Sequence, residues 1–215
     1  MNIGMTTYNR YSYLLRSIKS LFSTTFNDPT NLFIFDDASE DARIKKLLES
    51  LGHKENLNVN IIYNKKNIGC DPNMLLSIKE AFKNTDDDYV ITTDSDAIYN
   101  PEWYNNLKKR TLETQGKISG VSTFNTPSHP TIGDYNEHLV EKESLGGFAL
   151  AIKREVFEQI PSNQRSWDWL FTELSRDQGY KMLCTKDSYA EHIGKYGVHS
   201  VQGDEGDEAQ NFLGE

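Results

Sequence analysis

The chain has 215 residues, and its 23 Lys and Arg residues against 32 Asp and Glu residues give a formal net charge of −9. This acidic surplus argues against a protein that binds the phosphate backbone of nucleic acids, and no apolar run approaches the roughly 20 residues that span a bilayer. The N-terminus lacks the basic and apolar segments of a signal peptide, and Asn2 stands where N-myristoylation needs a glycine. Cys70 and Cys184 match no metal or redox spacing, so we expect a soluble, reduced, single-domain protein of the cytoplasm.

Strands and helices alternate along the first half of the chain. Short apolar runs predict strands over residues 3–7, 32–35, 59–63 and 89–93. Apolar residues at helical spacing predict helices over residues 11–24 and over about 40–51, the second with Ser39 as its cap. A third helix is predicted to start at Asp71-Pro72, as N-cap and first residue, and a fourth after Asn100-Pro101. This order is typical of a doubly wound parallel sheet, whose ligands bind beyond the carboxyl ends of the strands. Three polar loops are predicted there, at residues 6–10, 36–41 and 94–98.

The second half of the chain is less regular. Its apolar runs predict strands over residues 118–124 and 147–152, and helical spacing predicts helices over residues 153–159 and 166–178. Residues 125–144 are polar and show no clear period, so we expect a long loop, which in a compact domain is usually functional or mobile. Residues 203–215 are acidic and are expected to form a frayed tail.

Asp94-Ser95-Asp96 forms a D-x-D motif directly after the strand predicted at 89–93. Two carboxylates at this spacing on a strand-end loop can hold a hard divalent cation together with the oxygens of a diphosphate. About one such motif is expected by chance in a chain with this Asp content, and Asp86-Asp87-Asp88 is a second one. The second motif precedes the strand, where we expect a solvated turn. Position therefore favours the motif at Asp94 and Asp96.

Four polar fragments stand at the ends of predicted strands. They are Met5-Thr6-Thr7-Tyr8-Asn9-Arg10, Phe33-Ile34-Phe35-Asp36-Asp37-Ala38-Ser39, Asn67-Ile68-Gly69 and Asp94-Ser95-Asp96. In this order the fragments resemble the GT-A-fold glycosyltransferases, family 2 in particular, over roughly residues 1–200. The resemblance implies an α/β fold with a single GT-A (Rossmann-like) domain at 1–202, whose mostly parallel central sheet is flanked by helices. A nucleotide-binding half at 1–100 and an acceptor-side half at 101–202 would precede the acidic tail at 203–215.

For the nucleotide, the resemblance implies that Thr6 and Tyr8 contact the base and its ribose. Asp37 would accept a hydrogen bond from the base, with Asp36 as the less favoured partner. The other implied nucleotide-binding residues are Arg10, Asn67, Asp94 and Ser95. Two structural alternatives stay open: a helix-capping turn for Asp36 and Asp37 with Ser39, and plain packing for Tyr8. In a protein this acidic, we expect a cation and the local Arg10, Lys65 or Lys66 to offset the diphosphate charge.

For the metal, the resemblance implies a divalent cation, Mn²⁺ or Mg²⁺, with Asp96 as the direct ligand. Asp94 would lie near the ribose and a metal-bound water. His192 follows the last predicted strand and resembles the C-terminal histidine that completes the metal site of several GT-A enzymes; imidazole suits Mn²⁺. The alternative is a structural histidine, and Glu191 is a less favoured ligand. Residues 195–200 are expected to fold over the diphosphate, with Lys195 or His199 contacting phosphate.

A catalytic base is expected in the second half of the chain, because an acceptor hydroxyl must lose its proton. Family 2 enzymes often place this base in a Glu-Asp pair that begins a helix ending in Gly-Tyr. Here Asp168 begins such a helix and Gly179-Tyr180 ends it, whereas Trp167 replaces the usual Glu. The resemblance therefore implies Asp168 as the base. A helix-N-terminal acid favoured by the dipole is the structural alternative, and Glu173 is the second candidate base.

The expected sugar-binding residues surround this helix. Trp167 and Trp169 would desolvate Asp168 and raise its proton affinity, or form a platform for the face of an acceptor sugar. Gly146 and Gly147 resemble the family's Gly-rich segment, where small residues let the backbone approach the donor sugar. A turn that enters a strand needs the same glycines, so this alternative stays open.

The leading hypothesis is a metal-dependent, inverting glycosyltransferase. It would move a sugar from a UDP-, GDP- or dTDP-sugar to a hydroxyl of a glycan or glycoconjugate, with no nucleic-acid partner. One alternative is a nucleotide- or sugar-binding module without catalysis. A sugar nucleotidyltransferase is less favoured, because the first loop lacks a Gly-rich, basic phosphate cradle. Compact enzymes of this kind occur in bacteria and in large DNA viruses, so the expected cytoplasm is that of a bacterium or of an infected host.

Overall fold

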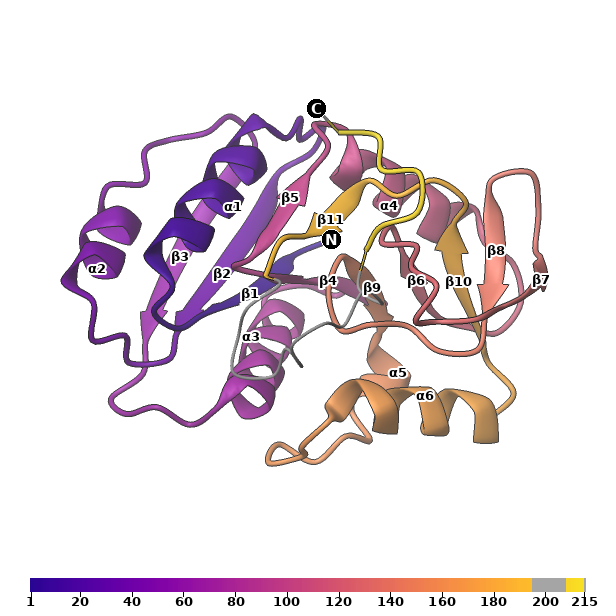
Figure 1. Cartoon of the computed structure of the whole chain (residues 1–215). Coiled ribbons are helices and arrows are strands. Elements are labelled where there is room, and N and C mark those ends of the chain that lie inside the picture. Colours follow the sequence, from indigo (N-terminus) through magenta and orange to yellow (C-terminus); the bar gives the residue numbers. More distant parts are fainter. Residues whose placement is uncertain (195–207, 215) are drawn as a thin grey trace.

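The computed structural model describes residues 1–194 and 208–214 (Figure 1). Its helices are α1 (Tyr11–Ser23), α2 (Ala42–Glu49), α3 (Cys70–Lys83), α4 (Trp103–Glu113), α5 (Arg154–Phe157) and α6 (Trp167–Asp177). Its strands are β1 (Ile3–Thr7), β2 (Thr30–Asp36), β3 (Leu57–Tyr63), β4 (Tyr89–Asp94), β5 (Ala97–Tyr99), β6 (Ile118–Ser122), β7 (Thr131–Asp134), β8 (Leu139–Lys142), β9 (Leu150–Lys153), β10 (Lys181–Thr185) and β11 (Ala190–His192).

One nine-stranded sheet runs through the domain in the order β3-β2-β1-β4-β9-β6-β10-β8-β7. The first four strands in this order are parallel, as the alternating sequence pattern predicts. Beyond them the sheet is mixed, because β9 runs antiparallel to both β4 and β6. The predicted α/β domain with a central sheet between helices is therefore confirmed. A separate two-stranded sheet joins β5 to β11.

Two apolar cores cover the two faces of the large sheet, and β2 contributes to both. Leu32 and Ile34 pack with α1, α2 and α4, whereas Phe33 and Phe35 pack with α3, α5 and α6. Successive side chains of a strand point to opposite faces, so a strand buried on both faces is apolar at every position. Figure 1 shows the same division, with α3, α5 and α6 below the sheet.

The expectation of a long loop at 125–144 is wrong, because this segment contains β7 and β8. Leu139 and Val140 are buried in β8, which pairs antiparallel with β10. The preceding turn is held by Asn136, whose side chain accepts hydrogen bonds from the backbone N–H groups of residues 138 and 139. Every residue of β7 is exposed, so no alternating apolar pattern marks that strand in the sequence.

Two predicted helix starts are also shifted. The N-cap of α2 is Asp41 rather than Ser39, and its carboxylate accepts a hydrogen bond from the backbone of Arg43. Helix α3 begins at Cys70 after Gly69, so Asp71-Pro72 lies in its first turn. Gly69 has φ +94°, a conformation that glycine adopts readily. None of the helices within residues 1–194 and 208–214 has the length and apolar character needed to cross a bilayer.

Candidate active site

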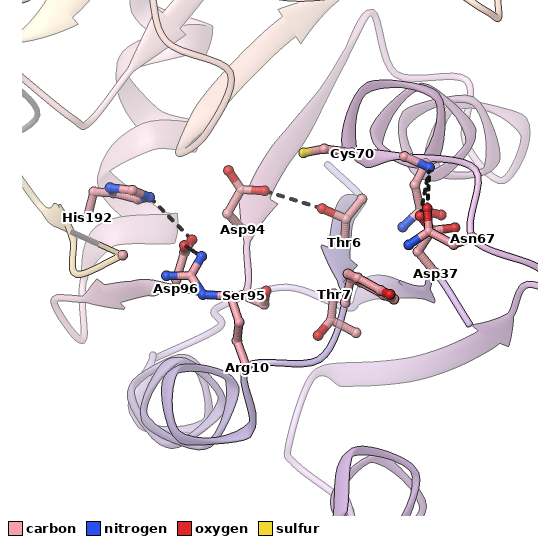
Figure 2. A pocket seen from close by; sticks show the side chains of 14 residues that line it. Thr6, Thr7, Arg10, Asp37, Asn67, Cys70, Asp94, Ser95, Asp96 and His192 are labelled. Atoms are coloured by element: carbon pink, nitrogen blue, oxygen red, sulfur yellow. Dashed lines mark hydrogen bonds and ion pairs between the residues drawn. The ribbon is translucent and has the colours of Figure 1, made fainter. Parts of the chain in front are cut away.

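A cavity of about 450 Å³ lies beyond the carboxyl ends of β1, β2 and β4, beside the first turn of α3. This is the point where the strand order reverses around β1, and doubly wound sheets bind their ligands there. The cavity is lined by these predicted nucleotide and metal residues: Thr6, Tyr8, Arg10, Asp37, Asn67, Asp94, Ser95, Asp96 and His192. They come from five separate segments of the chain, and Figure 2 shows the labelled ones converging on the cavity.

The register of the parallel strands β1 and β4 brings Thr6 and Asp94 together. Thr6 is the register partner of Asp94, and its hydroxyl donates a hydrogen bond of 3.3 Å to the Asp94 carboxylate. Burial raises the pKa of Asp94 to about 7, and the neighbouring charge of Asp96 adds to this rise. Asp94 is therefore the carboxylate of this pair with the higher affinity for a proton.

The Asp96 carboxylate is held by two cationic or hydrogen-bonding side chains from distant segments. Arg10 Nη1 lies 2.6 Å from Oδ2, and His192 Nε2 lies 3.3 Å from Oδ1. Burial would raise the pKa of Asp96, but the hydrogen bond and charge of His192 and the charge of Arg10 hold it below its usual range. Asp96 therefore stays an anion beside Asp94.

The pairing of β5 with β11 positions His192. The register sets His192 opposite Ala97, and the N–H of Ile193 donates to the Asp96 carbonyl over 2.8 Å. Sequence analysis expected His192 after the last strand, whereas it lies within β11. Gly194 lies two residues after His192, and a Cβ atom at this position would collide with the Asp96 carboxylate. The Asp96 side chain thus packs directly against the Gly194 backbone, where only a glycine leaves room for it.

Asp36 and Asp37 are occupied by contacts to the protein. The Asp36 carboxylate accepts hydrogen bonds from the N–H and hydroxyl of Ser39 and does not line the cavity; this turn does not cap α2, whose N-cap is Asp41. Asp37 is 2% exposed and accepts hydrogen bonds from the side chain of Asn64 and from the N–H groups of Ile68 and Gly69. Asp37 thus fixes the loop before α3 and forms part of the cavity wall.

Cys70 and Asn73 also line the cavity, although sequence analysis did not select them. Both lie in the first turn of α3, so a search of the helix start after the third strand would have found them. Asn73 donates to the carbonyl of Phe35 over 3.0 Å and accepts from Asn64 over 2.9 Å. Burial, together with the charges of nearby carboxylates such as Asp94, raises the pKa of Cys70 to about 12. Cys70 is therefore a neutral thiol at physiological pH.

At the rim, Tyr8 is 40% exposed, as a base-stacking side chain would need to be. Lys65 and Lys66 are exposed and do not line the cavity. The expected phosphate contacts of Lys195 and His199 lie outside the described residues.

Asp168 lies in the first turn of α6, next to the cavity and not among its lining residues. Burial raises its pKa, with a further contribution from the charge of Asp71. The charge of Asp168 in turn raises the pKa of Asp94, so the two carboxylates interact electrostatically. The backbone N–H of Ser166 donates a 3.0 Å hydrogen bond to Asp71, which connects the start of α6 to the start of α3. Glu173, the second candidate base, is exposed.

Gly146 and Gly147 do not line the cavity either; Gly147 lies between β4 and α6, and Gly146 lies against His129. The Thr92 hydroxyl donates to the carbonyl of Gly147 over 2.6 Å, and a Cβ atom on Gly147 would lie 2.8 Å from the ring of Trp167. Trp167 is buried at 4% exposure, whereas Trp169 is 56% exposed. The two tryptophans therefore differ in role: Trp167 packs, and Trp169 offers a free aromatic face.

A metal site would have few protein ligands. No group of three or more His, Cys, Asp or Glu side chains is arranged to hold an ion anywhere in residues 1–194 or 208–214. Asp96 and His192 do form a suitable pair of ligands, because Asp96 Oδ1 and His192 Nε2 are 3.3 Å apart. Two ligands at right angles, each about 2.1 Å from one ion, lie about 3 Å apart. The pair therefore fits two neighbouring positions around a single cation.

Solved structures of low sequence identity share this fold. TarS of S. aureus in complex with UDP is 16% identical, with a TM-score of 0.61 over 88% of this chain and 59% of the TarS chain. TarS in complex with UDP-GlcNAc gives 17% identity, a TM-score of 0.62 and coverage of 92% and 61%. The mannosyltransferase PcManGT of Pyrobaculum calidifontis, in complex with GDP-Man and Mn²⁺, gives 16% identity, a TM-score of 0.59 and coverage of 84% and 53%.

The chain thus spans only 59% of the TarS chain and 53% of the PcManGT chain. No curated protein sequence matches it. The family model described as Glycosyl transferase family 2 matches residues 2–191, which include every cavity residue except His192 and Gly194. The chain therefore belongs to glycosyl transferase family 2 and has the GT-A fold.

Proposed function

We propose that this chain is a metal-dependent, inverting glycosyltransferase that moves a sugar from a nucleoside-diphosphate sugar to a hydroxyl of a glycan or glycoconjugate. The observation that carries the proposal is the cavity at the strand ends, where Asp94, Asp96, Arg10 and His192 meet. The division into a nucleotide-binding half at 1–100 and an acceptor-side half at 101–202 belongs to this proposal, as does action in the cytoplasm.

For the donor, the neighbours TarS and PcManGT support a uridine or guanosine diphosphate sugar, because they bind UDP-GlcNAc and GDP-Man. In this chain, Tyr8 would stack on the base at the open rim of the cavity, and Thr6 would contact the ribose. Asp37 would meet the base only at an edge of its carboxylate, since its oxygens already accept hydrogen bonds from three donor groups. Asn67 reaches the same wall of the cavity.

For the cation, Asp96 and His192 would supply the protein ligands, and the diphosphate and water would supply the others. Mg²⁺ sites are commonly built this way, from one or two protein ligands, substrate phosphates and water. The presence of Mn²⁺ with GDP-Man in PcManGT supports Mn²⁺ as the ion. When bound, the cation would offset charge on the departing nucleoside diphosphate.

For catalysis, Asp168 would take the proton from the acceptor hydroxyl. The oxygen of that hydroxyl then forms a bond to the anomeric carbon of the donor while the bond to the diphosphate oxygen breaks, which inverts the configuration in a single displacement. Burial suits Asp168 to this role, because a raised pKa makes a carboxylate a better proton acceptor. Trp169 offers its exposed ring to the face of the acceptor sugar.

The test is calorimetric binding of UDP, GDP, dTDP and CMP to the whole chain, each with and without Mn²⁺. We expect one nucleotide to bind tightly, and only with Mn²⁺ and an intact Asp96, so Asp96→Ala should lose this binding. Asp86→Ala is the matched control, because Asp86 belongs to the second D-x-D motif, at residues 86–88, and is exposed. No Mn²⁺-dependent binding to any of the four would contradict the proposal.

Turnover separates an enzyme from a binding module, the alternative supported by the position of Asp168 outside the cavity lining. The sugars of the nucleotide that binds are incubated with the chain, and release of nucleoside diphosphate is measured. A transferase releases it and loses this activity in Asp168→Asn, whereas a module binds the donor and releases none.

A further inference from the structure

Arg10 occupies one oxygen of Asp96, the residue to which the proposed function gives the cation. Its guanidinium nitrogen Nη1 lies 2.6 Å from Oδ2. His192 takes the other oxygen, so both sides of this buried carboxylate are engaged. Figure 2 shows the guanidinium directly beneath the carboxylate, within the cavity.

The backbone around Arg10 fixes the position of its side chain beside Asp96. Asn9 and Arg10 are both left-handed, with φ of 51° and 54°, which is uncommon for residues other than glycine. Asn9 is tied to the loop before α2, because its N–H donates to Ser39 and its side chain accepts from the N–H groups of Glu40 and Asp41. The guanidinium also lies 4.4 Å from the ring centroid of Tyr13. The ion pair is therefore positioned by contacts on both sides of Arg10.

A divalent cation bound between Asp96 Oδ1 and His192 Nε2 would lie close to the guanidinium on Oδ2, and the two positive charges would repel each other. A cation that arrives alone must bind against this repulsion. A cation that arrives with a diphosphate brings oxygens that a guanidinium binds well, often through two parallel hydrogen bonds.

We propose that Arg10 is an internal counter-ion that holds Asp96 until the donor arrives and then transfers to the diphosphate, so that Mn²⁺ binds appreciably only together with the nucleotide. This inference rests on the proposed function. It adds that metal and nucleotide affinities are coupled through one side chain. Coupling of this kind is reciprocal: the nucleotide raises the affinity for Mn²⁺ by the factor by which Mn²⁺ raises the affinity for the nucleotide.

The test measures free Mn²⁺ by electron paramagnetic resonance in titrations of the whole chain, without nucleotide and with UDP or GDP. In Arg10→Gln we expect Mn²⁺ alone to bind about tenfold more tightly than in the wild type, within the usual range of coupling between sites. The same variant should bind the nucleotide with Mn²⁺ more weakly. Arg43→Gln is the matched control, since Arg43 forms an exposed ion pair with Asp41 away from the cavity, and should change neither affinity.

Arg10→Lys keeps the positive charge and guards against a variant that fails to fold, which circular dichroism would reveal. It should keep the weak binding of Mn²⁺ alone and lose part of the affinity for the nucleotide. If Mn²⁺ binds the wild type with a nucleotide but Arg10→Gln leaves the affinity for Mn²⁺ alone unchanged or lower, the counter-ion role is wrong and the proposed function stands. If Mn²⁺ binds no form of the chain under any condition, both are wrong.

Discussion

Replacing Asp37 with alanine should cost stability as well as nucleotide affinity. Its carboxylate accepts hydrogen bonds of 2.8 Å from Asn64, 2.9 Å from Ile68 and 2.9 Å from Gly69. A hydrogen bond to a charged group contributes about 1.5–3 kcal/mol. Water would replace part of this loss, because the loop donors are only partly buried, so we expect Asp37→Ala to lower the free energy of unfolding by about 3 kcal/mol.

For a domain of this size, about 3 kcal/mol corresponds to a fall in Tm of roughly 6–12 °C. Thermal unfolding followed by circular dichroism measures it, with Asp86→Ala as a control that should melt like the wild type. Asp37→Asn should fall between the two, since an amide keeps one acceptor oxygen and turns a second polar atom into a donor. A Tm within about 2 °C of the wild type for Asp37→Ala, with nucleotide binding lost, would refute this reasoning. Asp37 would then act through the base alone.

Three further predictions concern the other walls of the site. Gly194→Ala should displace the Asp96 carboxylate and weaken Mn²⁺–nucleotide binding about tenfold or more by calorimetry; an unchanged affinity would exclude this close approach. The pKa of Asp168 is raised, and a base works only when deprotonated, so kcat should fall as the pH drops through a value above the ordinary Asp range. In Asp71→Asn this acidic limb should move to lower pH, because one negative charge near the base is removed; a pH profile that stays in place would contradict the assignment. Trp169→Ala should raise the acceptor KM without changing Tm, since the ring is exposed; equal KM values would exclude an acceptor platform.

The parallel half of the fold is predictable from the sequence because burial on both faces leaves a clear mark. The run at 32–35 is apolar at every position, and the two cores take its side chains alternately. Once four such strands alternate with helices, the carboxyl-end rule places Thr6 and Asp94 at one edge without further information. The structure has a cavity at that edge, lined by both residues.

The hairpin of β7 and β8 could not be predicted in this way. Its outer strand is exposed at all four positions, so no apolar period distinguishes it from a loop. The inner strand includes Lys142, a buried lysine whose Nζ donates to the carbonyls of Thr126 and His129. Sequence patterns treat a lysine as a surface residue, whereas here backbone carbonyls satisfy it and burial lowers its pKa.

The two acidic residues at the carboxyl end of β2 show why residue type does not fix a role. Asp36 and Asp37 are adjacent and chemically identical, but one caps a turn at Ser39 and the other holds the loop before α3. The donors to Asp37 include backbone N–H groups, which every residue except proline possesses. No sequence pattern distinguishes a carboxylate that accepts from such groups from one that awaits a ligand.

The net charge of −9 repels an anionic ligand, and cationic groups within the site oppose this repulsion locally. A nucleoside diphosphate is an anion, and the cavity presents it with Asp94 and Asp96 in addition to the acidic surface. Two opposing side chains come from opposite ends of the chain: Arg10 from the start of α1, and His192 from β11. Because the His192 contact depends on the pairing of β5 with β11, a chain folded only through the first four strands would hold the carboxylates with Arg10 but without His192. We therefore expect the proposed nucleotide-binding half to need β11, which carries His192, before it holds an anionic donor.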